Sequence, residues 1–268
     1  PYMQNNNKRN IYLNFYTFLL SYLTLKKYYG SVTMYCNQQA YDTFIKYIPY
    51  DEIIIKENKN DMDFWNVYKI DIMKLQNEDF IHVDSDVFIF NDLFSKFING
   101  NHDMIVQDII PPSENFVKKF FWDNYSYLTN GNLSLSTSYD NRCVSCGTFG
   151  MKKHMLNKYF YIFDIIHNAM KENKLKSNNC QTMILEELMA YLTALKYNNK
   201  IYDVLPYDLV LKHGVRKVGD IKKYTHLWTN SKFRNDIIFK VKKRIKKDFP
   251  KKYDLVEFYD KNIISKIR

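Results

Sequence analysis

Residues 80–90 read Phe80-Ile81-His82-Val83-Asp84-Ser85-Asp86-Val87-Phe88-Ile89-Phe90, an apolar run typical of a buried strand that two aspartates interrupt. Charge inside a buried strand costs free energy unless a cation or strong hydrogen-bond donors meet it. Because residues i and i+2 of a strand point to the same face, we expect Asp84 and Asp86 to converge on one ion while Ser85 faces away. Carboxylate ligands suit Mg²⁺ or Mn²⁺, which also bind substrate phosphates. The stretch therefore predicts a divalent metal site for a nucleotide diphosphate. The alternative is a strand end at which two aspartates begin a turn.

The residues before this run favour the metal interpretation. Residues 64–75 place apolar side chains at Trp65, Tyr68, Ile72 and Leu75, close to the helical period. A helix, a strand and then carboxylates at the carboxyl end of the strand is the α/β arrangement in which ligands bind beyond the strand ends.

The stretch Phe64-Trp65…Lys69…Phe80-Ile81-His82-Val83-Asp84-Ser85-Asp86-Val87-Phe88…Leu93-Phe94 resembles the DxD region of the GT-A fold, nucleotide-sugar-dependent glycosyltransferases. The similarity is to glycogenin-like and bacterial polysaccharide-type members. This resemblance implies an α/β, Rossmann-like fold with a mostly parallel central sheet flanked by helices.

The same resemblance implies roles for individual side chains. Asp86 would bind the metal directly, and Asp84 would contact the ribose or the metal. Trp65, Lys69 and Ser85 would lie at the nucleotide sugar.

A second motif follows near the C-terminus. His226-Leu227-Trp228-Thr229-Asn230-Ser231-Lys232 has the spacing of the glycogenin-like HxxGxxK motif, with Thr229 in place of glycine. The resemblance implies that His226 is a metal ligand and that Lys232 binds the diphosphate. An imidazole completes a mixed nitrogen and oxygen coordination sphere, and an ammonium neutralises a leaving diphosphate. The alternative is that His226 caps a strand and Lys232 is a solvated charge.

A third match is Val144-Ser145-Cys146-Gly147-Thr148-Phe149-Gly150, which resembles the N-x-G-x-(F/M)-G strand that lines the donor sugar. Ser145 replaces the usual asparagine, and Gly147 keeps the small residue that a close ligand needs. A strand with a bulge is the alternative.

The segment Thr182-Met183-Ile184-Leu185-Glu186-Glu187-Leu188-Met189 begins an amphipathic helix. In the similar family this region often carries an acidic residue that faces the acceptor. Glu186 or Glu187 is therefore a candidate to orient an acceptor hydroxyl or to act as general base, unless both are solvated helix-surface groups.

The chain as a whole alternates between helical and extended patterns. With 268 residues, 46% of them hydrophobic, it can form a full α/β core. We expect one GT-A domain over residues 1–235 and a basic helical extension over 236–268 packed on it. Since the chain begins at Pro1 and the first clear strand follows a helix, we also expect a leading base-binding strand before Pro1. Alternation predicts helices on both faces of the sheet. The expected elements are helix 11–29, strand 31–36, helix 38–47, strand 52–56, helix 62–76, strand 79–84, helix 92–98, a strand at 104–106, strand 144–151, helices 155–172 and 180–195, and a strand at 201–204.

The net charge of +10 is concentrated in residues 240–252. A solvated helix face is one explanation of this segment. An anionic membrane surface carrying lipid-linked acceptors, or a nucleic acid, is the other.

Cysteine usage and hydropathy bear on the compartment. The four cysteines suggest no disulfide scaffold, and the CxxC formed by Cys143 and Cys146 has neither a second CxxC nor paired histidines to complete a zinc site. No run of about 18 apolar residues is present. We therefore expect a cytoplasmic protein that can lie peripherally at the inner face of a membrane.

The leading hypothesis from the sequence is a glycosyltransferase that uses Mn²⁺ or Mg²⁺ and a nucleotide diphosphate sugar, with UDP-sugar preferred. Its hydroxyl acceptor is unspecified among glycan, lipid-linked, protein and nucleic-acid groups. One alternative is a DNA-modifying glycosyltransferase that acts on a hydroxylated base. The other is a non-enzymatic nucleic-acid or membrane-binding module with an incidental DxD.

Overall fold

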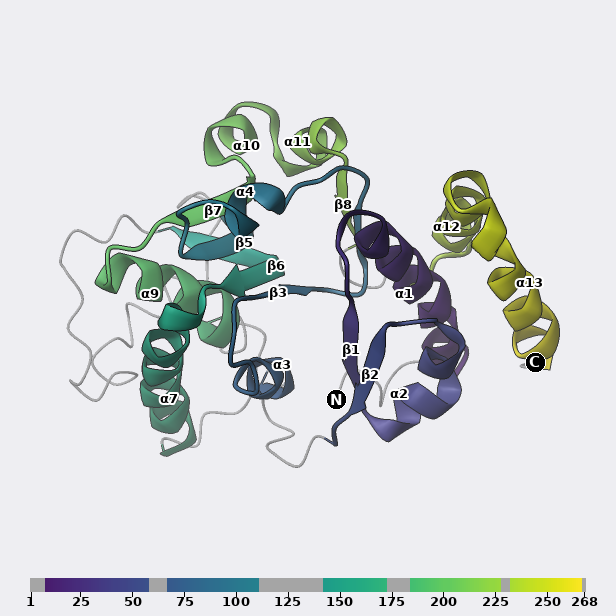
Figure 1. Ribbon diagram of the computed structural model, residues 1–268, viewed down its shortest axis with the longest axis horizontal. Coiled ribbons are helices and arrows are strands. Elements are labelled where there is room, and N and C mark those ends of the chain that lie inside the picture. The colour runs from purple at the N-terminus through teal and green to yellow at the C-terminus, as the bar shows by residue number, and fades with distance from the viewer. Residues whose placement is uncertain (1–7, 58–66, 111–141, 173–183, 228–231, 267–268) are drawn as a thin grey trace. The chain divides into compact units, whose positions relative to one another are not determined.

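The computed structural model describes residues 8–57, 67–110, 142–172, 184–227 and 232–266. It is a mixed α/β structure with both parallel and antiparallel strand pairs (Figure 1). The chain forms two compact units. The first comprises Pro1–Lys59, Asp84–Asp92 and Lys223–Arg268, and the second comprises Asn60–Val83 and Leu93–Lys222.

The first unit combines helices with two small sheets. β1 pairs in parallel with β2, and β4 pairs antiparallel with β8. Asn37 begins the second helix by accepting a hydrogen bond from the backbone N–H of Ala40 at 2.8 Å, a side-chain N-cap. The elements are α1 (Lys8–Tyr28), β1 (Thr33–Cys36), α2 (Gln38–Thr43), β2 (Glu52–Ile55), β4 (Val87–Ile89), β8 (Tyr224–His226), α12 (Asn235–Asp248) and α13 (Tyr253–Asn262).

The long helix α1 organises the core of this unit. It contacts β4 and α12, so segments from both ends of the chain share one hydrophobic core (Figure 1). The ring of Phe15 stacks on that of Tyr259 with centroids 3.8 Å apart. The hydroxyl of Tyr16 donates to Asp260, whose carboxylate also lies 2.7 Å from Lys242 Nζ. The C-terminal helices are therefore an integral part of the first unit.

The second unit is built on a four-stranded sheet in the order β3-β6-β5-β7. β6 runs antiparallel to both β3 and β5, and only β5 and β7 pair in parallel. The elements are α3 (Val67–Met73), β3 (Phe80–Val83), α4 (Ser95–Ile98), β5 (Met104–Ile110), β6 (Cys143–Met151), α7 (Leu156–Glu172), a π-helix (Ile184–Leu188), α9 (Met189–Lys196), β7 (Ile201–Leu205), α10 (Tyr207–His213) and α11 (Val215–Lys222).

The prediction of a mostly parallel sheet is wrong for the described strands. Alternation of helices and strands predicts parallel neighbours because each helix returns the chain to the same end of the sheet. Here β6 enters between β3 and β5 in the opposite direction, and its nine residues are all buried. A buried strand reads as a continuous apolar run whichever way it points, so hydropathy alone cannot give its direction.

Most expected helices and strands are present, with shifted ends. The strand expected at 104–106 extends to Ile110, while the helix expected over 62–76 is seen as α3 because residues 62–66 lie outside the described part of the chain. Strand β8 and helices α10 and α11 were not predicted, and β4 is the part of the strand-like run 80–90 that follows the two aspartates. The domain boundary at residue 235 stays a prediction. Among the described helices, none is both long and apolar enough to cross a membrane.

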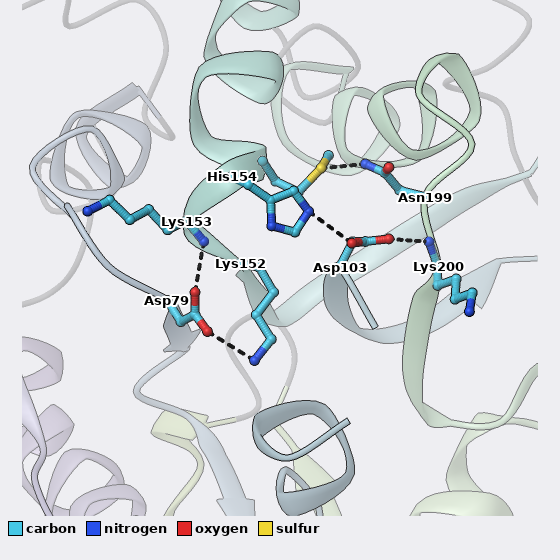
Figure 2. Close-up of polar contacts among 8 residues, drawn as sticks. Asp79, Asp103, Lys152, Lys153, His154, Asn199 and Lys200 are labelled. Carbon is cyan, nitrogen blue, oxygen red and sulfur yellow. Dashed lines mark hydrogen bonds and ion pairs between the residues drawn. The ribbon is translucent and has the colours of Figure 1, made fainter. Parts of the chain in front are cut away.

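Polar side chains fasten one end of the sheet of the second unit (Figure 2). Asp103, just before β5, accepts from the backbone N–H of Lys200 at 2.8 Å and contacts His154 Nε2 at 2.9 Å. Asp79, just before β3, accepts from the backbone N–H of Lys153 at 2.8 Å and lies 3.0 Å from Lys152 Nζ. Each aspartate thus ties the start of one strand to the segment that follows β6.

We expect Gly150→Ala to destabilise the protein. A Cβ at this position of β6 would lie 2.3 Å from the carbonyl oxygen of Phe80 and 2.9 Å from Ile81 Cα, both backbone atoms of β3. To make room for this Cβ, β6 must move away from β3 or its backbone must shift. The substitution should therefore lower the unfolding free energy by about 1–3 kcal/mol, which guanidinium chloride denaturation would measure. Gly30→Ala is the control, since nothing lies within 4 Å of its added Cβ. Equal stability of the two variants would contradict the packing described.

We expect the stabilising contribution of Asp79 to depend on pH. Partial burial tends to raise the pKa of this carboxyl, but the Lys153 N–H and the Lys152 ammonium outweigh burial and lower it below its ordinary value. The folded chain therefore binds fewer protons than the unfolded chain. The stability is complete above the unfolded pKa of about 3.9 and is lost as pH falls through the lower folded value.

The measurement is the difference in unfolding free energy between wild type and Asp79→Asn. Because this side chain is half exposed, the difference should be at most about 1 kcal/mol at pH 6. It should shrink as the pH falls from about 5 through the lowered folded pKa of Asp79. Glu78→Gln, which removes the neighbouring exposed charge, should show no such trend, and a pH-independent difference for Asp79→Asn would overturn the assignment.

Candidate metal centre

Pairing of β4 with β8 builds this site. In the antiparallel register, Val87 faces His226, and the backbone N–H of Leu227 donates to the carbonyl oxygen of Asp86 at 3.0 Å. Residues far apart in the sequence are thereby adjacent. The pairing could have been anticipated from the apolar run after the aspartates, which resumes as a strand and needs a partner.

The two aspartates lie in a turn after a strand end, which is the alternative considered from the sequence, and the expectation that they lie inside a strand is wrong. β3 ends at Val83 and β4 begins at Val87, and the backbone N–H of Val87 donates to the carbonyl oxygen of Asp84 at 3.0 Å. Ser85 is half-buried in this turn. Convergence of the carboxylates therefore comes from the tight turn and not from the i, i+2 geometry of a strand.

Three side chains nevertheless converge as expected. One ligand atom from each of Asp84, Asp86 and His226 lies within 4.8 Å of the others, and this is the one such group of three found in the described residues. His226 Nε2 is 3.5 Å from an oxygen of Asp86. Asp86 is buried, with 7% of its surface exposed, whereas Asp84 and His226 are half-buried.

Lys232 also reaches this group. Its Nζ donates to Asp86 Oδ2 at 2.7 Å, on the oxygen that does not face His226. Burial tends to raise the pKa of Asp86, but the contact with His226 and the charge of Lys232 outweigh burial and lower it below its ordinary value. Asp86 is therefore a buried carboxylate that stays ionised because positive and hydrogen-bonding groups surround it.

The donor set fits a divalent cation. Two carboxylates and an imidazole nitrogen form a mixed oxygen and nitrogen set, which suits Mn²⁺ and is tolerated by Mg²⁺. Ligand atoms about 2.2 Å from a shared ion lie up to about 4.4 Å apart, so small side-chain rotations would let one ion contact all three. The charge balance also fits, because two carboxylates would be offset by a divalent ion.

In the second unit, two residues predicted for different roles contact each other. Lys69 Nζ, expected at the nucleotide sugar, is ion-paired with Glu186, expected at the acceptor, and also donates to the carbonyl oxygen of Cys146 at 3.0 Å. Glu186 is 6% exposed and lies in the π-helix, so the alternative of a solvated helix-surface glutamate is wrong for this residue. A buried ion pair of this kind holds its partners in place.

The same ion pair anchors an irregularity in β6. Register against β5 jumps from Val106–Phe149 to Asp108–Ser145, so β6 carries extra residues between these pairs. Ser145 and Gly147 flank the Cys146 carbonyl that Lys69 holds. The bulge considered from the sequence is thus present, and bulges often re-aim side chains near functional sites.

Some predicted residues remain unassigned. Glu187 lies beside Glu186 in the π-helix, and its role as general base stays a prediction. Trp65 lies outside the described residues. Cys143 and Cys146 are buried in β6 and form no disulfide within the described part of the chain.

One buried polar pair, in β5, was not predicted from the sequence. Gln107 and Asp108 lie within β5, with 0% and 3% of their surfaces exposed, and Gln107 Nε2 donates to Asp108 Oδ1 at 3.0 Å. A carboxylate inside the apolar run 104–110 carries the same sequence signal as Asp86, so it could have been found by the same reasoning.

We expect Lys232→Met to destabilise the metal-free protein because it removes a charged partner from the buried carboxylate of Asp86. The loss should be about 1–3 kcal/mol of unfolding free energy at pH 7 in EDTA. In an Asp86→Asn background the same substitution should cost less than about 0.5 kcal/mol, since the neutral amide needs no counter-charge. Equal costs in the two backgrounds would show that the 2.7 Å contact carries no coupling.

Comparison with known proteins identifies the family of the chain but no activity. Searches of curated proteins and of solved structures found no match. A family model described as a family of unknown function, DUF6734, matches residues 5–258, nearly the whole chain. The chain therefore belongs to the DUF6734 family.

Proposed function

We propose that the protein is a metal-dependent glycosyltransferase of GT-A type that transfers a sugar from a nucleotide diphosphate sugar, with UDP-sugar preferred, to a hydroxyl acceptor. The observation that carries the proposal is the convergence of Asp84, Asp86 and His226 around one point, with Lys232 on the same carboxylate. These four residues belong to two separate motifs that resemble glycosyltransferase motifs. Chance motifs have no reason to meet in space.

Asp84, Asp86 and His226 would hold Mn²⁺ or Mg²⁺. When bound there, the ion would supply positive charge to the diphosphate and so stabilise it as a leaving group. The turn at Asp84–Asp86 and the β4–β8 pairing fix the ligands on short, hydrogen-bonded backbone, which limits the reorganisation needed for binding.

Lys232 has a second role in this proposal. Its ammonium contacts Asp86 at 2.7 Å and would offset the carboxylate charge whenever no cation is bound. A cation bound by Asp86 would replace that function, and the lysine, 25% exposed at its side chain, would be able to turn toward an anionic diphosphate. Lys232 would thus keep the carboxylate ionised before loading and neutralise phosphate charge afterwards.

In the second unit, the residues at the β6 bulge keep the roles that the resemblance gives them, contact with the donor sugar for Ser145 and Gly147. The buried Lys69–Glu186 pair supports a fixed position for Ser145 and Gly147. Because Glu186 is already engaged by Lys69, a role in holding the bulge fits it better than proton abstraction. We propose no general base from the described contacts.

Nucleotide-dependent stabilisation tests the proposal. A ligand that binds only the native state raises stability by mass action, by about 2.7 kcal/mol at a concentration 100 times its Kd. We expect UDP with Mn²⁺ to raise the melting temperature by several degrees, more than GDP or CDP with Mn²⁺ and more than UDP in EDTA.

Two variants make this test specific. Asp86→Asn should abolish the Mn²⁺-dependent shift, whereas Asp236→Asn, which removes an exposed carboxylate from the same unit, should retain it. The absence of a Mn²⁺-dependent shift with any nucleotide, or equal shifts in both variants, would contradict the proposed function.

A further inference from the structure

Helix α12 has one face in the core and one basic face in water. Ile238, Val241 and Ile245 are buried in the core of the first unit. At 100° per residue, the exposed residues occupy a continuous arc on the opposite side. The exposed residues of this arc, here called the basic face, are Phe239, Lys240, Lys243, Arg244, Lys246 and Lys247, together with Asp236.

Phe239 is the unusual member of the basic face. Its side chain is 67% exposed, the highest value among the large hydrophobic residues described as exposed. Lys243 and Lys246 lie one and two turns further along the same arc. A single exposed phenylalanine needs no explanation, but one set among lysines on an outward helix face combines apolar and cationic surface in a small area.

Most of the lysine charge on the basic face is not neutralised. Between Asn235 and Lys252 the sequence has eight basic and two acidic residues. Lys242 is ion-paired with Asp260, and Arg244 is ion-paired with Asp248. Within the described part of the chain, Lys243 and Lys247 have no ion pair. The face therefore presents a positive potential suited to an anionic partner.

We propose that the basic face of α12 binds the surface of an anionic lipid membrane. Phe239 would enter the boundary between headgroups and acyl chains, and the lysines around it would contact anionic headgroups. Attraction to anionic lipid contributes about a fivefold gain in affinity for each lysine near the surface. Binding through one helix face would be reversible and salt-sensitive.

The chemistry of the face favours lipid over nucleic acid. Its one guanidinium, on Arg244, pairs with Asp248 and lies over the ring of Phe90 at 3.9 Å, so it is not available as a bidentate phosphate or base ligand. The remaining cations are lysine ammoniums, which act as point charges without directional recognition. Lysine charges spread around the exposed ring of Phe239 therefore suit a fluid lipid surface. This inference does not depend on the metal centre.

The test is sedimentation of the full chain with sucrose-loaded vesicles. Vesicles of phosphatidylcholine alone are compared with vesicles containing 30% phosphatidylserine, at about 0.1 M salt. The variants are Lys243→Glu/Lys247→Glu and Phe239→Ala. Their control is Lys153→Glu/Lys200→Glu, which changes the net charge equally at two exposed lysines of the second unit (Figure 2).

We expect binding to the phosphatidylserine vesicles only, and weaker binding as salt rises. Lys243→Glu/Lys247→Glu should reduce the affinity at least 20-fold and Phe239→Ala about fivefold, while the control stays within twofold of wild type. All replaced side chains are exposed, so the melting temperatures should be unchanged.

Three results would overturn the proposal. They are equal binding to both vesicle types or to neither, an equal loss in the control variant, and an unchanged affinity for Phe239→Ala. A parallel titration with a duplex oligonucleotide identifies the partner in the last case. Duplex binding that is lost in Lys243→Glu/Lys247→Glu but unaffected by Phe239→Ala would make nucleic acid the partner.

Discussion

The buried, ionised carboxylate of Asp86 is the constraint on which the candidate site depends. A charge with only 7% of its residue surface exposed must be met by cations or donors, or it becomes protonated. The fold meets it from two directions. β8 brings His226 to within 3.5 Å, and the segment after β8 brings Lys232 to 2.7 Å. The contact with His226 depends on the pairing of β4 with β8, so a short antiparallel ladder supports the electrostatics of the centre.

The second unit also contains a buried carboxylate with a charged partner, but that partner is a single lysine. Glu186, also buried, is neutralised by Lys69, and this ion pair holds the backbone of β6 at the point where its register with β5 is interrupted. Both units therefore place a buried carboxylate next to an interruption of a strand. In the first unit the carboxylate belongs to Asp86, one of three side chains that could hold a metal, whereas in the second unit Lys69 contacts Glu186 and also donates to the backbone of β6.

The residues of the candidate centre were predicted from the sequence more accurately than their backbone geometry. The sequence alone shows charged residues that interrupt apolar runs, and it shows motifs that follow one another in a fixed order. These two signals predicted Asp84, Asp86, His226 and Lys232. Their placement in a turn was one of two arrangements left open by the sequence, because a strand and a turn at Asp84–Asp86 predict the same metal-binding residues. The direction of β6 was also hidden, since a fully buried strand has no alternation that records its neighbours. The ion pair between Lys69 and Glu186 joins residues distant in the chain, and only the fold could show that two separately predicted residues contact each other.

The most direct test of the central claim is a crystal of the protein grown with UDP and Mn²⁺, with anomalous scattering data collected to locate manganese. We expect a single strong anomalous peak bonded to Asp86 and His226, within reach of Asp84, with Lys232 displaced from Asp86 toward the diphosphate. A manganese peak elsewhere, or none while the Lys232–Asp86 contact persists, would contradict the assignment of this cluster as a metal centre.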